Sequence, residues 1–506
     1  MRTQQGSVPG WSKLFSYCSL SMQHADRLVG YVRPKVGHTP SARLPSMAAI
    51  RIQAIRGLSA PAARSAAGRR AVPPAAAIKH CSWDGSLDSS STSGTSPALA
   101  RGRGGSRGAA CASRRAVVAK AAEFNPSLFG AGATPPKYGL DPVFDTDIDD
   151  YVAALDAVGG GDGLIAVASS EGTIHVLSAA SGEIVSTFEG HEDGANCIKF
   201  SPDGSALASG GWDGMVRVWS LAPDGKSHEL LAEEKVETDG RGLKLVDAVA
   251  FSPDGSLVAA AAGTKIKVLA VPAAGEKATA HALTPVGSSV SGMQISKDSE
   301  VLASCYGGVY CVPVTAEGEA NLGGVYSWQT SIVSLAMSPC EKWIAGGTQD
   351  QSVHIWNKET GDDFAMWGYQ FKVGQLHWSS DSRYLATAGG SEPNVWDFSG
   401  TGPIGSAPIV CMGMLGKITA LQMQPGGTLL AGGGNDGGLL LWDVSRFDEG
   451  NRNKMCNRVC GAGGPDEVSA VQWISSDLLL VGYGSGNVVL RKLALREGFP
   501  NMMGAQ

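Results

Sequence analysis

The chain repeats itself from about residue 151 onward, at intervals of about 40 to 50 residues. Short apolar runs alternate with turns rich in Gly, Asp, Ser and Asn, and helical periodicity is nearly absent. This pattern is typical of an all-β fold built from strands and tight turns. Because one repeat of this length cannot bury both of its faces alone, neighbouring repeats must cover one another.

Two landmarks recur in each repeat. The first is a turn, seen as FSPDGS at 200–205 and again at 251–256, where proline and Asp-Gly suit a hairpin. The second is a bulky residue that ends a strand. It occurs at intervals of 42, 50, 43, 44, 40, 46 and 49 residues, as Leu177, Trp219, Leu269, Val312, Trp356, Trp396, Trp442 and Arg491. This spacing predicts a propeller, in which four-stranded blades bury each other's faces.

The strand ends carry a recognisable motif. WDGMVRVWS at 212–220, IWN at 355–357, VWD at 395–397 and LWD at 441–443 resemble the repeats of the WD-repeat (WD-40) β-propeller family. The resemblance covers residues 150–493 and implies an all-β propeller of four-stranded blades. We expect eight blades; the alternative is seven, with one degenerate unit outside the ring.

The chain divides into four parts. Residues 1–122 form a leader that we expect to be disordered, and residues 123–149 form a linker. The propeller occupies 150–493, and 494–506 form a C-terminal tail. Because the last repeat lacks a good fourth strand, we expect PVFDTDI at 142–148 to supply it and close the ring, as the family resemblance implies.

The leader differs from the rest of the chain in charge. Residues 1–122 hold 18 Lys and Arg but only 3 Asp and Glu, whereas the remainder carries a formal net charge of −21. A basic, hydroxyl-rich and acid-poor segment is typical of an organelle transit peptide. SRRAVVAKAAEF at 113–124 resembles a chloroplast processing site, which favours the chloroplast stroma over the mitochondrion or cytoplasm. Met47 is an alternative start to Met1.

The leader also offers an alternative function. RGRGGSRG at 101–108 resembles an Arg-Gly segment of the kind that binds RNA, so an RNA-associated protein is one alternative. The acidic remainder of the chain disfavours nucleic-acid binding elsewhere, because attraction to phosphates needs positive charge.

One stretch holds the residue types of a catalytic triad: His191, Ser209 and Asp213. A propeller-framed hydrolase is therefore a second alternative. However, Ser209 lies inside the apolar run ALASGG with no nucleophile-elbow sequence, whereas a triad needs an exposed serine. The family resemblance implies instead a structural tetrad, in which Ser209 accepts the indole N–H of Trp219 and Asp213 accepts from His191.

Other repeats keep only parts of this tetrad, so we expect apolar packing to dominate there. Glycine stands at the serine position in two of them, namely Gly346 and Gly432. The retained residues are Asp350 and Trp356, Thr387 and Trp396, and Asp436 and Trp442.

No sequence pattern indicates an enzyme, a cofactor or a metal. Cys456 and Cys460, in a segment we expect to be a loop, lack two further ligands for a metal ion. The glycine cluster at 159–163 lacks the Gly-Lys-Ser/Thr ending of a phosphate-binding loop. No apolar run approaches ~18 residues, so no membrane span is expected.

What remains is recognition of other proteins, for which propellers of this family generally act as rigid platforms. Aromatic side chains on loops are the usual anchors of such contacts. The candidates are Trp212, Trp328, Trp367 and Tyr369, together with Arg217, which alternates outward on its strand. The alternative role for these aromatic residues is to seal the seams between blades.

A narrower resemblance concerns residues 366–408 and 418–443, including DFSGTGP at 397–403. These segments are similar to a bacterial and plastid-type subgroup of WD-repeat proteins. Bacterial members lie beside metallochaperone-type GTPases of the CobW class, so the resemblance implies a CobW-type partner in metal homeostasis.

Overall fold

The computed structural model describes residues 51–54, 138–236, 245–271, 279–314, 320–400, 402–449 and 454–496. These residues belong to the compact unit 49–506, and the unit Met1–Ala48 lies outside them. The described chain is built from strands, with one short 3-10 turn at Gly160–Asp162. None of its helices is long and apolar enough to cross a membrane.

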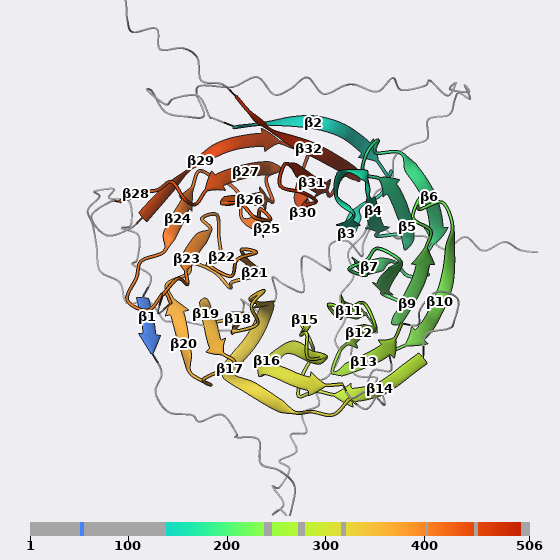
Figure 1. Cartoon of the computed structure of the whole chain (residues 1–506), viewed down its shortest axis with the longest axis horizontal. Coiled ribbons are helices and arrows are strands. Elements are labelled where there is room, and N and C mark those ends of the chain that lie inside the picture. The colour runs from blue at the N-terminus through green and yellow to red at the C-terminus, as the bar shows by residue number, and fades with distance from the viewer. Residues whose placement is uncertain are drawn as a thin grey trace, which may run out of the picture. The chain divides into compact units, whose positions relative to one another are not determined.

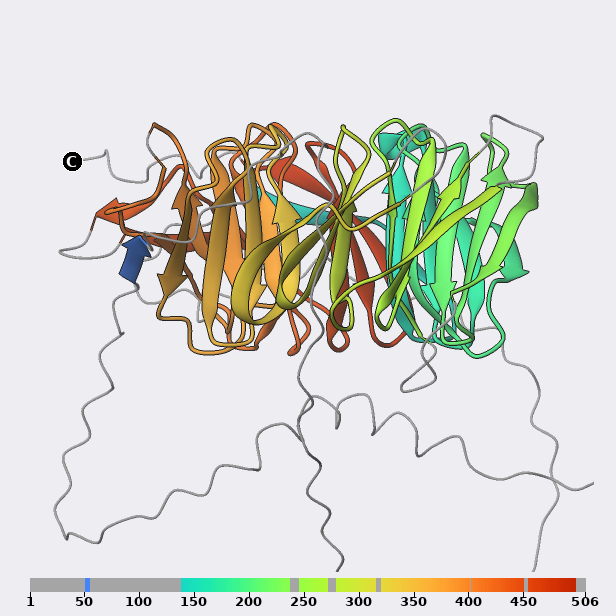
Figure 2. The same cartoon turned by 90° about the horizontal axis from the view of Figure 1, so that it is seen from below.

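The strands between 138 and 496 lie around a ring and run between its two ends (Figures 1 and 2). Three antiparallel sheets follow chain order, with the first strand innermost and the fourth outermost in Figure 1. They are β3 (Val152–Val158), β4 (Leu164–Ser169), β5 (Thr173–Ser178) and β6 (Ile184–Glu189); β7 (Ala195–Phe200), β8 (Ala206–Gly211), β9 (Met215–Leu221) and β10 (His228–Lys235); and β11 (Val246–Phe251), β12 (Leu257–Ala262), β13 (Lys265–Ala270) and β14 (Thr279–Pro285). The fold is an all-β propeller, as expected.

The next sheet joins two repeats through one long strand. β17 pairs with β16 through its first half, to Ser331, and with β18 through its second half, from Ile332. It therefore ends one repeat on the outside of the ring and begins the next on the inside. The strands are β15 (Gly292–Ile295), β16 (Glu300–Pro313), β17 (Gly324–Met337), β18 (Trp343–Thr348), β19 (Ser352–Asn357) and β20 (Asp363–Trp367).

Two further repeats are also joined, through β29. Residues 454–457 of β29 pair in parallel with β24, and residues 458–463 pair antiparallel with β27. Asp397, the first residue of the DFSGTGP segment, ends β23, which shares only two register pairs with β24. The strands are β21 (Gln375–Trp378), β22 (Tyr384–Ala388), β23 (Asn394–Asp397), β24 (Ile409–Met412), β25 (Ile418–Met423), β26 (Leu429–Gly434), β27 (Gly438–Asp443), β28 (Asp448–Glu449) and β29 (Lys454–Gly463).

The position of β29 corrects one expectation. Cys456 and Cys460 lie in this strand and are buried, so the prediction of a loop there is wrong. Cys456 is the register partner of Cys411 in β24, which is also buried. The physical reason is non-local: the segment gains its strand conformation by pairing with β24 and β27, which its own composition does not reveal.

The two ends of the ring-forming chain meet in the last sheet. β2 (Tyr138–Asp147) pairs antiparallel with β32 (Asn487–Leu495), followed inward by β31 (Leu478–Tyr483) and β30 (Val468–Trp473). Most of the PVFDTDI segment lies in β2, but the strand begins earlier, at Tyr138. β32 also extends past residue 493, where we expected the propeller to end. The number of blades stays a prediction.

A short strand also lies within the leader. β1 (Arg51–Ala54) pairs antiparallel with β20, from Arg51↔Trp367 to Ala54↔Phe364. The expectation that all of residues 1–122 stand outside the fold is therefore wrong for 51–54. The outer edge of β20 offers unpaired backbone groups, and composition alone does not predict which segment meets them.

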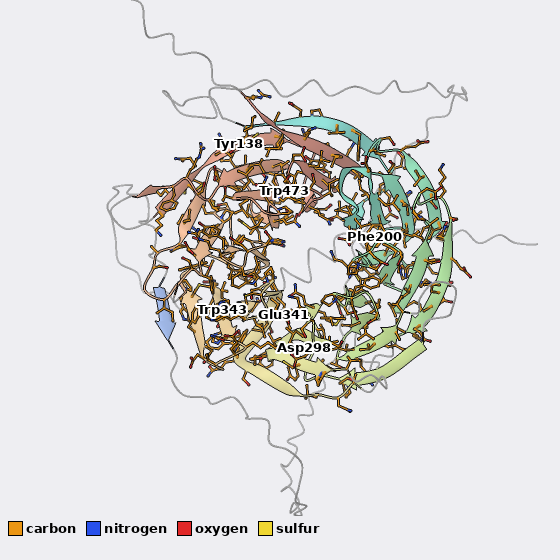
Figure 3. All side chains as sticks on the ribbon, viewed as in Figure 1. Tyr138, Phe200, Asp298, Glu341, Trp343 and Trp473 are labelled. Atoms are coloured by element: carbon orange, nitrogen blue, oxygen red, sulfur yellow. The ribbon has the colours of Figure 1, made fainter. Side chains whose placement is uncertain are left out.

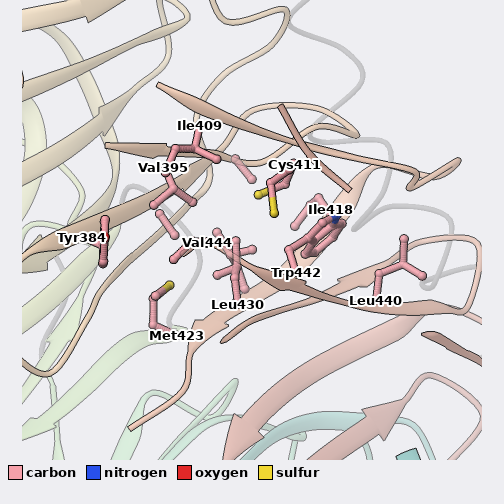
Figure 4. Packing of buried hydrophobic residues seen from close by; sticks show 14 of the residues in the cluster. Tyr384, Val395, Ile409, Cys411, Ile418, Met423, Leu430, Leu440, Trp442 and Val444 are labelled. Carbon is pink, nitrogen blue, oxygen red and sulfur yellow. The ribbon is translucent and has the colours of Figure 1, made fainter. Parts of the chain in front are cut away.

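The second strands of the repeats are buried along most or all of their length because neighbouring sheets cover both of their faces. Every residue of β4, β8 and β26 is buried. Figure 4 shows one resulting cluster, in which Trp442 and Leu430 of one repeat pack with Val395 and Ile409 of the preceding one. Burial on both faces explains the nearly continuous apolar runs of these strands.

We predict that removal of β2 destabilises the ring. A variant beginning at Ile148 should unfold at a temperature about 5 °C or more lower than a variant beginning at Tyr138, because β32 loses its whole outer ladder and the core loses the buried side chain of Leu140. Thermal unfolding followed by circular dichroism measures this difference. Equal midpoints for the two variants would contradict ring closure by β2.

Candidate functional site

The four residues of the expected tetrad meet in one repeat. His191 precedes β7, Ser209 lies in β8, Asp213 in the following turn and Trp219 in β9. His191 Nδ1 lies 3.0 Å from Asp213 Oδ1, and its Nε2 lies 2.9 Å from Ser209 Oγ. Trp219 Nε1–H donates to Ser209 Oγ at 3.2 Å. A proton on Nδ1 satisfies the set, since Ser209 O–H can then donate to Nε2.

Asp213 is the most heavily engaged carboxylate of this group. It accepts from Arg217 Nη1 at 2.7 Å and from the backbone N–H of Met215 at 3.0 Å. Burial alone would raise the pKa of Asp213, but the hydrogen bonds from His191, Arg217 and Met215 hold it well below its ordinary value. The carboxylate therefore stays ionised and ties the loop before β7 to the turn between β8 and β9.

Arg217 is held in the same network. Its Nε donates to Glu233 Oε1 at 2.9 Å, in addition to its pair with Asp213, and the side chain is only 12% exposed. The expectation that Arg217 projects outward to meet a partner is wrong. The pairing of β9 with β10 brings Glu233 opposite Arg217 and closes the guanidinium between two carboxylates.

The tetrad does not have the geometry of a nucleophilic triad. Ser209 is fully buried, and its Oγ is occupied by both Trp219 and His191. A nucleophile must instead face a substrate beside oxyanion-hole donors. Within the described part of the chain, no group of three or more His, Cys, Asp or Glu side chains has the arrangement of a metal site.

A second network replaces the histidine with a tyrosine. Trp396 Nε1–H donates to Tyr369 Oη at 2.9 Å, and Tyr369 Oη lies 2.9 Å from Thr387 Oγ1. Tyr369 is buried, which raises the pKa of its phenol to about 12. The expectation that Tyr369 anchors a partner is therefore wrong. The signal was in the sequence, because Tyr369 precedes Thr387 by 18 residues, as His191 precedes Ser209.

The repeat around β19 uses its residues differently. Asp350 accepts from Ser352 Oγ at 2.7 Å and from Thr348 Oγ1, so it closes its own turn. Trp356 is buried, and a Cβ atom at Gly346 would lie 3.1 Å from its ring. The glycine at the serine position therefore gives space to the indole.

The repeat around β27 follows the same principle. A Cβ atom at Gly432 would lie 2.8 Å from the ring of Trp442, whose Nε1–H donates to the carbonyl of Met412 at 2.8 Å. Asp436 accepts from the backbone N–H of Gly416 at 2.8 Å. The Asp and Trp positions are kept, but a backbone carbonyl takes the place of the serine as the indole acceptor.

Trp328 and Trp367, expected separately as anchors, belong to one aromatic cluster. Their ring centroids lie 5.8 Å apart, and Trp328 lies 4.0 Å from the ring of His354. Both tryptophans are half-buried. Trp328 Nε1 and His354 Nδ1 are buried without a hydrogen-bond partner among the described residues. The cluster seals the outer part of the ring between β17, β19 and β20.

Two strongly exposed apolar side chains at one end of the ring were missed by the sequence reasoning. Leu415 is 90% exposed and Phe371 56% exposed. They lie in the loops before β25 and β21, at the end of the ring that also carries the turn with Trp212, which is half-buried. Gly390 links the two loops: its carbonyl accepts from Ile418 N–H at 2.9 Å, and a Cβ atom on it would lie 3.6 Å from the Phe371 ring.

We predict that Trp219→Ala destabilises the protein by about 3 to 5 kcal/mol, because it leaves a cavity and removes the donor to Ser209. Trp219→Phe should cost less, since it removes the N–H but keeps most of the ring volume. Urea unfolding of the two variants measures the difference. An unchanged midpoint for Trp219→Ala would contradict a buried tetrad.

We predict a pH-dependent contribution from His354. Burial lowers its pKa from 6.5 to about 4, although Asp363, whose Oδ2 lies 2.8 Å from Nε2, acts in the opposite direction. The folded protein then binds fewer protons than the unfolded chain between these values. Stability should fall by about 3 kcal/mol as the pH drops from 6.5 to 4.

The matched variant for this measurement is His354→Gln, which cannot titrate. Urea unfolding at several pH values should show a shallower loss of stability in the variant than in the natural chain. Parallel curves for the two proteins would show that His354 does not stay neutral in the fold.

Comparisons with known proteins agree with this geometry. The WD domain, G-beta repeat family matches residues 182–220, 322–357 and 410–443. The ribosome biogenesis protein WDR12 homolog of Chlamydomonas reinhardtii is 25% identical over 59% of this chain and 66% of its own. WD repeat-containing protein 1 of Gallus gallus is 23% identical over 55% of this chain and 51% of its own.

The chain is also similar to one protein over a short segment and to one solved structure. Periodic tryptophan protein 2 of Saccharomyces cerevisiae is 36% identical over 17% of this chain and 8% of its own. The chain thus spans less than two thirds of the length of these relatives. The crystal structure of the computationally designed Ika8 protein aligns with a TM-score of 0.55 and 21% identity over 70% of this chain and 100% of its own, which shows the fold alone. The repeats, the tetrad and these matches show that the chain belongs to the WD-repeat family.

Proposed function

We propose that this chain is a non-catalytic scaffold that binds other proteins through the ring. The observation that carries the proposal is the burial of Ser209 within the tetrad. Its hydroxyl, the nucleophile that a triad of His191, Ser209 and Asp213 would need, forms its hydrogen bonds inside the blade. The family membership supports the same function, since WD-repeat proteins typically act as scaffolds. The hydrolase alternative loses its nucleophile by this argument.

We place the binding face at the end of the ring that carries the loops before β21 and β25. Phe371 and Leu415 expose apolar surface there without burying it against the blades. Trp212, in the repeat that holds the tetrad, lies at the same end and remains a candidate anchor for a partner protein. Exposed aromatic and aliphatic side chains on a rigid frame are suited to act as anchors of a protein interface.

The location and the partner belong to the same proposal. The basic leader and the Val-Val-Ala stretch before residue 120 support import into the chloroplast stroma, with the mitochondrion and cytoplasm as alternatives. The DFSGTGP segment supports the narrower subgroup and, through it, a CobW-type GTPase partner. The Arg-Gly segment at 101–108, on which the RNA alternative rests, lies outside the described residues.

We predict that Phe371→Asp combined with Leu415→Asp reduces partner capture by about tenfold or more, because charge is placed at the apolar anchors. Proximity labelling of the full chain, tagged at its C-terminus, measures capture by mass spectrometry. Thermal unfolding of the variant should be unchanged, since both side chains are exposed.

The control is Leu322→Asp, the same change at an exposed leucine in the segment before β17, away from these loops. Stromal neighbours that depend on Phe371 and Leu415 would support the proposal. Equal labelling by both variants would contradict the proposed face. Neighbours confined to ribosome assembly would instead favour a role like the one in the name of the WDR12 homolog.

A further inference from the structure

The innermost strands of the ring are joined by a repeated hydrogen bond. A side chain near the end of one innermost strand accepts the backbone N–H of the next innermost strand. Asp156 Oδ2 accepts from Phe200 N–H at 2.8 Å, and Gln294 Oε1 accepts from Met337 N–H at 2.7 Å. His377 Nδ1 with Met423 N–H, and Gln422 with Trp473 N–H, continue the pattern.

The backbone geometry explains why these N–H groups need an acceptor. Successive N–H groups of a strand point to opposite sides. Ser201 N–H donates to Ala206 of its own repeat at 2.8 Å, so the N–H of Phe200 must point away, toward the preceding repeat. The same holds at Ser338, whose N–H donates to the carbonyl of Trp343 at 2.8 Å, so the N–H of Met337 also points toward the preceding repeat.

Two adjacent seams lack this acceptor. Ser252 N–H donates to Leu257, and Ser296 N–H to Glu300, each at 2.9 Å, so the N–H groups of Phe251 and Ile295 are turned outward as well. The residues that stand where Asp156 and Gln294 stand elsewhere are Lys199 and Ala250. Neither side chain can accept a hydrogen bond, and no described side chain accepts from these two N–H groups.

A third seam without a polar residue is closed by other means. Ala336 occupies the acceptor position there, but its carbonyl accepts from Trp378 Nε1–H at 3.1 Å. At the closing seam of the ring, Gln472 Nε2–H donates to Asp156 at 3.2 Å and to the carbonyl of Ala157 at 3.3 Å. No described side chain accepts from the backbone N–H of Trp378 either, so the two seams after Lys199 and Ala250 differ from this one in lacking a substitute contact such as the indole bond.

A cavity of about 450 Å³ lies at these two seams. Its wall includes Lys199, Phe251 and Ile295, and Lys297 lies at its rim. Apolar side chains, including Val249, Met293 and Met337, form most of the remaining wall, together with Pro202, Pro253 and Pro339 from the recurring turns. Figure 3 shows Phe200 and Glu341, two further wall residues, on the inner side of the ring.

We propose that this cavity binds a carboxylate side chain of a partner protein, flanked in the partner's sequence by apolar residues. The carboxylate would accept from the N–H group of Ile295, at the position where Ala250 supplies no acceptor, and pair with Lys199. Asp156 already does this one seam away, where it accepts from Phe200 N–H and from Lys199 Nζ at 3.0 Å. Lys199 lines the cavity, its side chain is 51% exposed, and its ammonium group pairs with Asp156 at 3.0 Å.

The remaining charges fit this assignment. Glu341, the acidic wall residue, accepts from Lys297 N–H at 2.8 Å and is thereby engaged. A carboxylate alone would leave the apolar wall uncovered, so an adjacent apolar side chain of the same partner completes the fit. The inference rests on the proposed scaffold function and assigns it a second surface, at the end of the ring that carries the recurring turns with Pro202, Pro253 and Pro339.

The test uses two fluorescein-labelled peptides, acetyl-Ala-Leu-Glu-Leu-Ala-amide and the same peptide with Gln in place of Glu. The full chain should bind the Glu peptide about tenfold or more tightly than the Gln peptide, because hydrogen bonds to a charged acceptor are stronger. Fluorescence anisotropy measures both affinities. Hydrogen exchange should slow at Ile295 when the Glu peptide binds.

Three variants locate the effect. Ala250→Asp supplies the missing acceptor within the chain and should weaken binding of the Glu peptide by about tenfold or more. Lys199→Met removes the cation and should also weaken binding; Asp156 then keeps its hydrogen bonds from Phe200 N–H and Gln472 Nε2–H, and thermal unfolding checks that the variant stays folded. Lys492→Met makes the same change at a lysine that is 61% exposed and outside the cavity, and should leave binding unchanged.

Equal binding of the two peptides, or no binding of the Glu peptide, would overturn the proposal. Binding that survives both Ala250→Asp and Lys199→Met would overturn it as well. These results are separable from failure of the scaffold function, because labelled partners that depend on Phe371 and Leu415 can be retained when this cavity binds nothing.

Discussion

Burial of the middle strands on both faces is the constraint on which the rest of this structure depends. A strand such as β8 has every residue buried, so it can form only when sheets lie on both sides of it. No repeat can then stand at a free end of the array. Closure of the ring removes such free ends. β2 completes the sheet of β30–β32 although more than 300 residues separate it from them.

The same burial creates a polar problem that the repeats solve separately. An unpaired buried indole N–H costs about 1 to 3 kcal/mol; those of Trp328 and Trp473 have no partner among the described residues, but others have an acceptor. Ser209 supplies it for Trp219, Tyr369 for Trp396 and the carbonyl of Met412 for Trp442. The tetrad is thus one solution among several. Its histidine and serine serve the fold for the same reason that they cannot serve catalysis.

Local patterns predicted the fold class and most strands of the repeats, because turns and apolar runs are short-range signals. The tetrad of His191, Ser209, Asp213 and Trp219 was implied by the family resemblance, because these residues stand at the family's matching positions. Tyr369 was assigned to the wrong role because an aromatic residue in a loop looks the same whether it is buried or exposed.

Features that depend on distant pairing could not be predicted in this way. The shared strand β17, the parallel contact of β24 with β29 and the pairing of β1 all join segments whose own composition is unremarkable for a strand or a leader. The unfilled acceptor positions at Lys199 and Ala250 belong to the same class. Neither residue carries a sequence signal of its own. Only the arrangement of neighbouring innermost strands shows that a backbone N–H without a side-chain acceptor faces it. A rigid ring can therefore carry recognition in its backbone as well as in its loops, wherever a repeat omits the side chain that its neighbours use to close a seam.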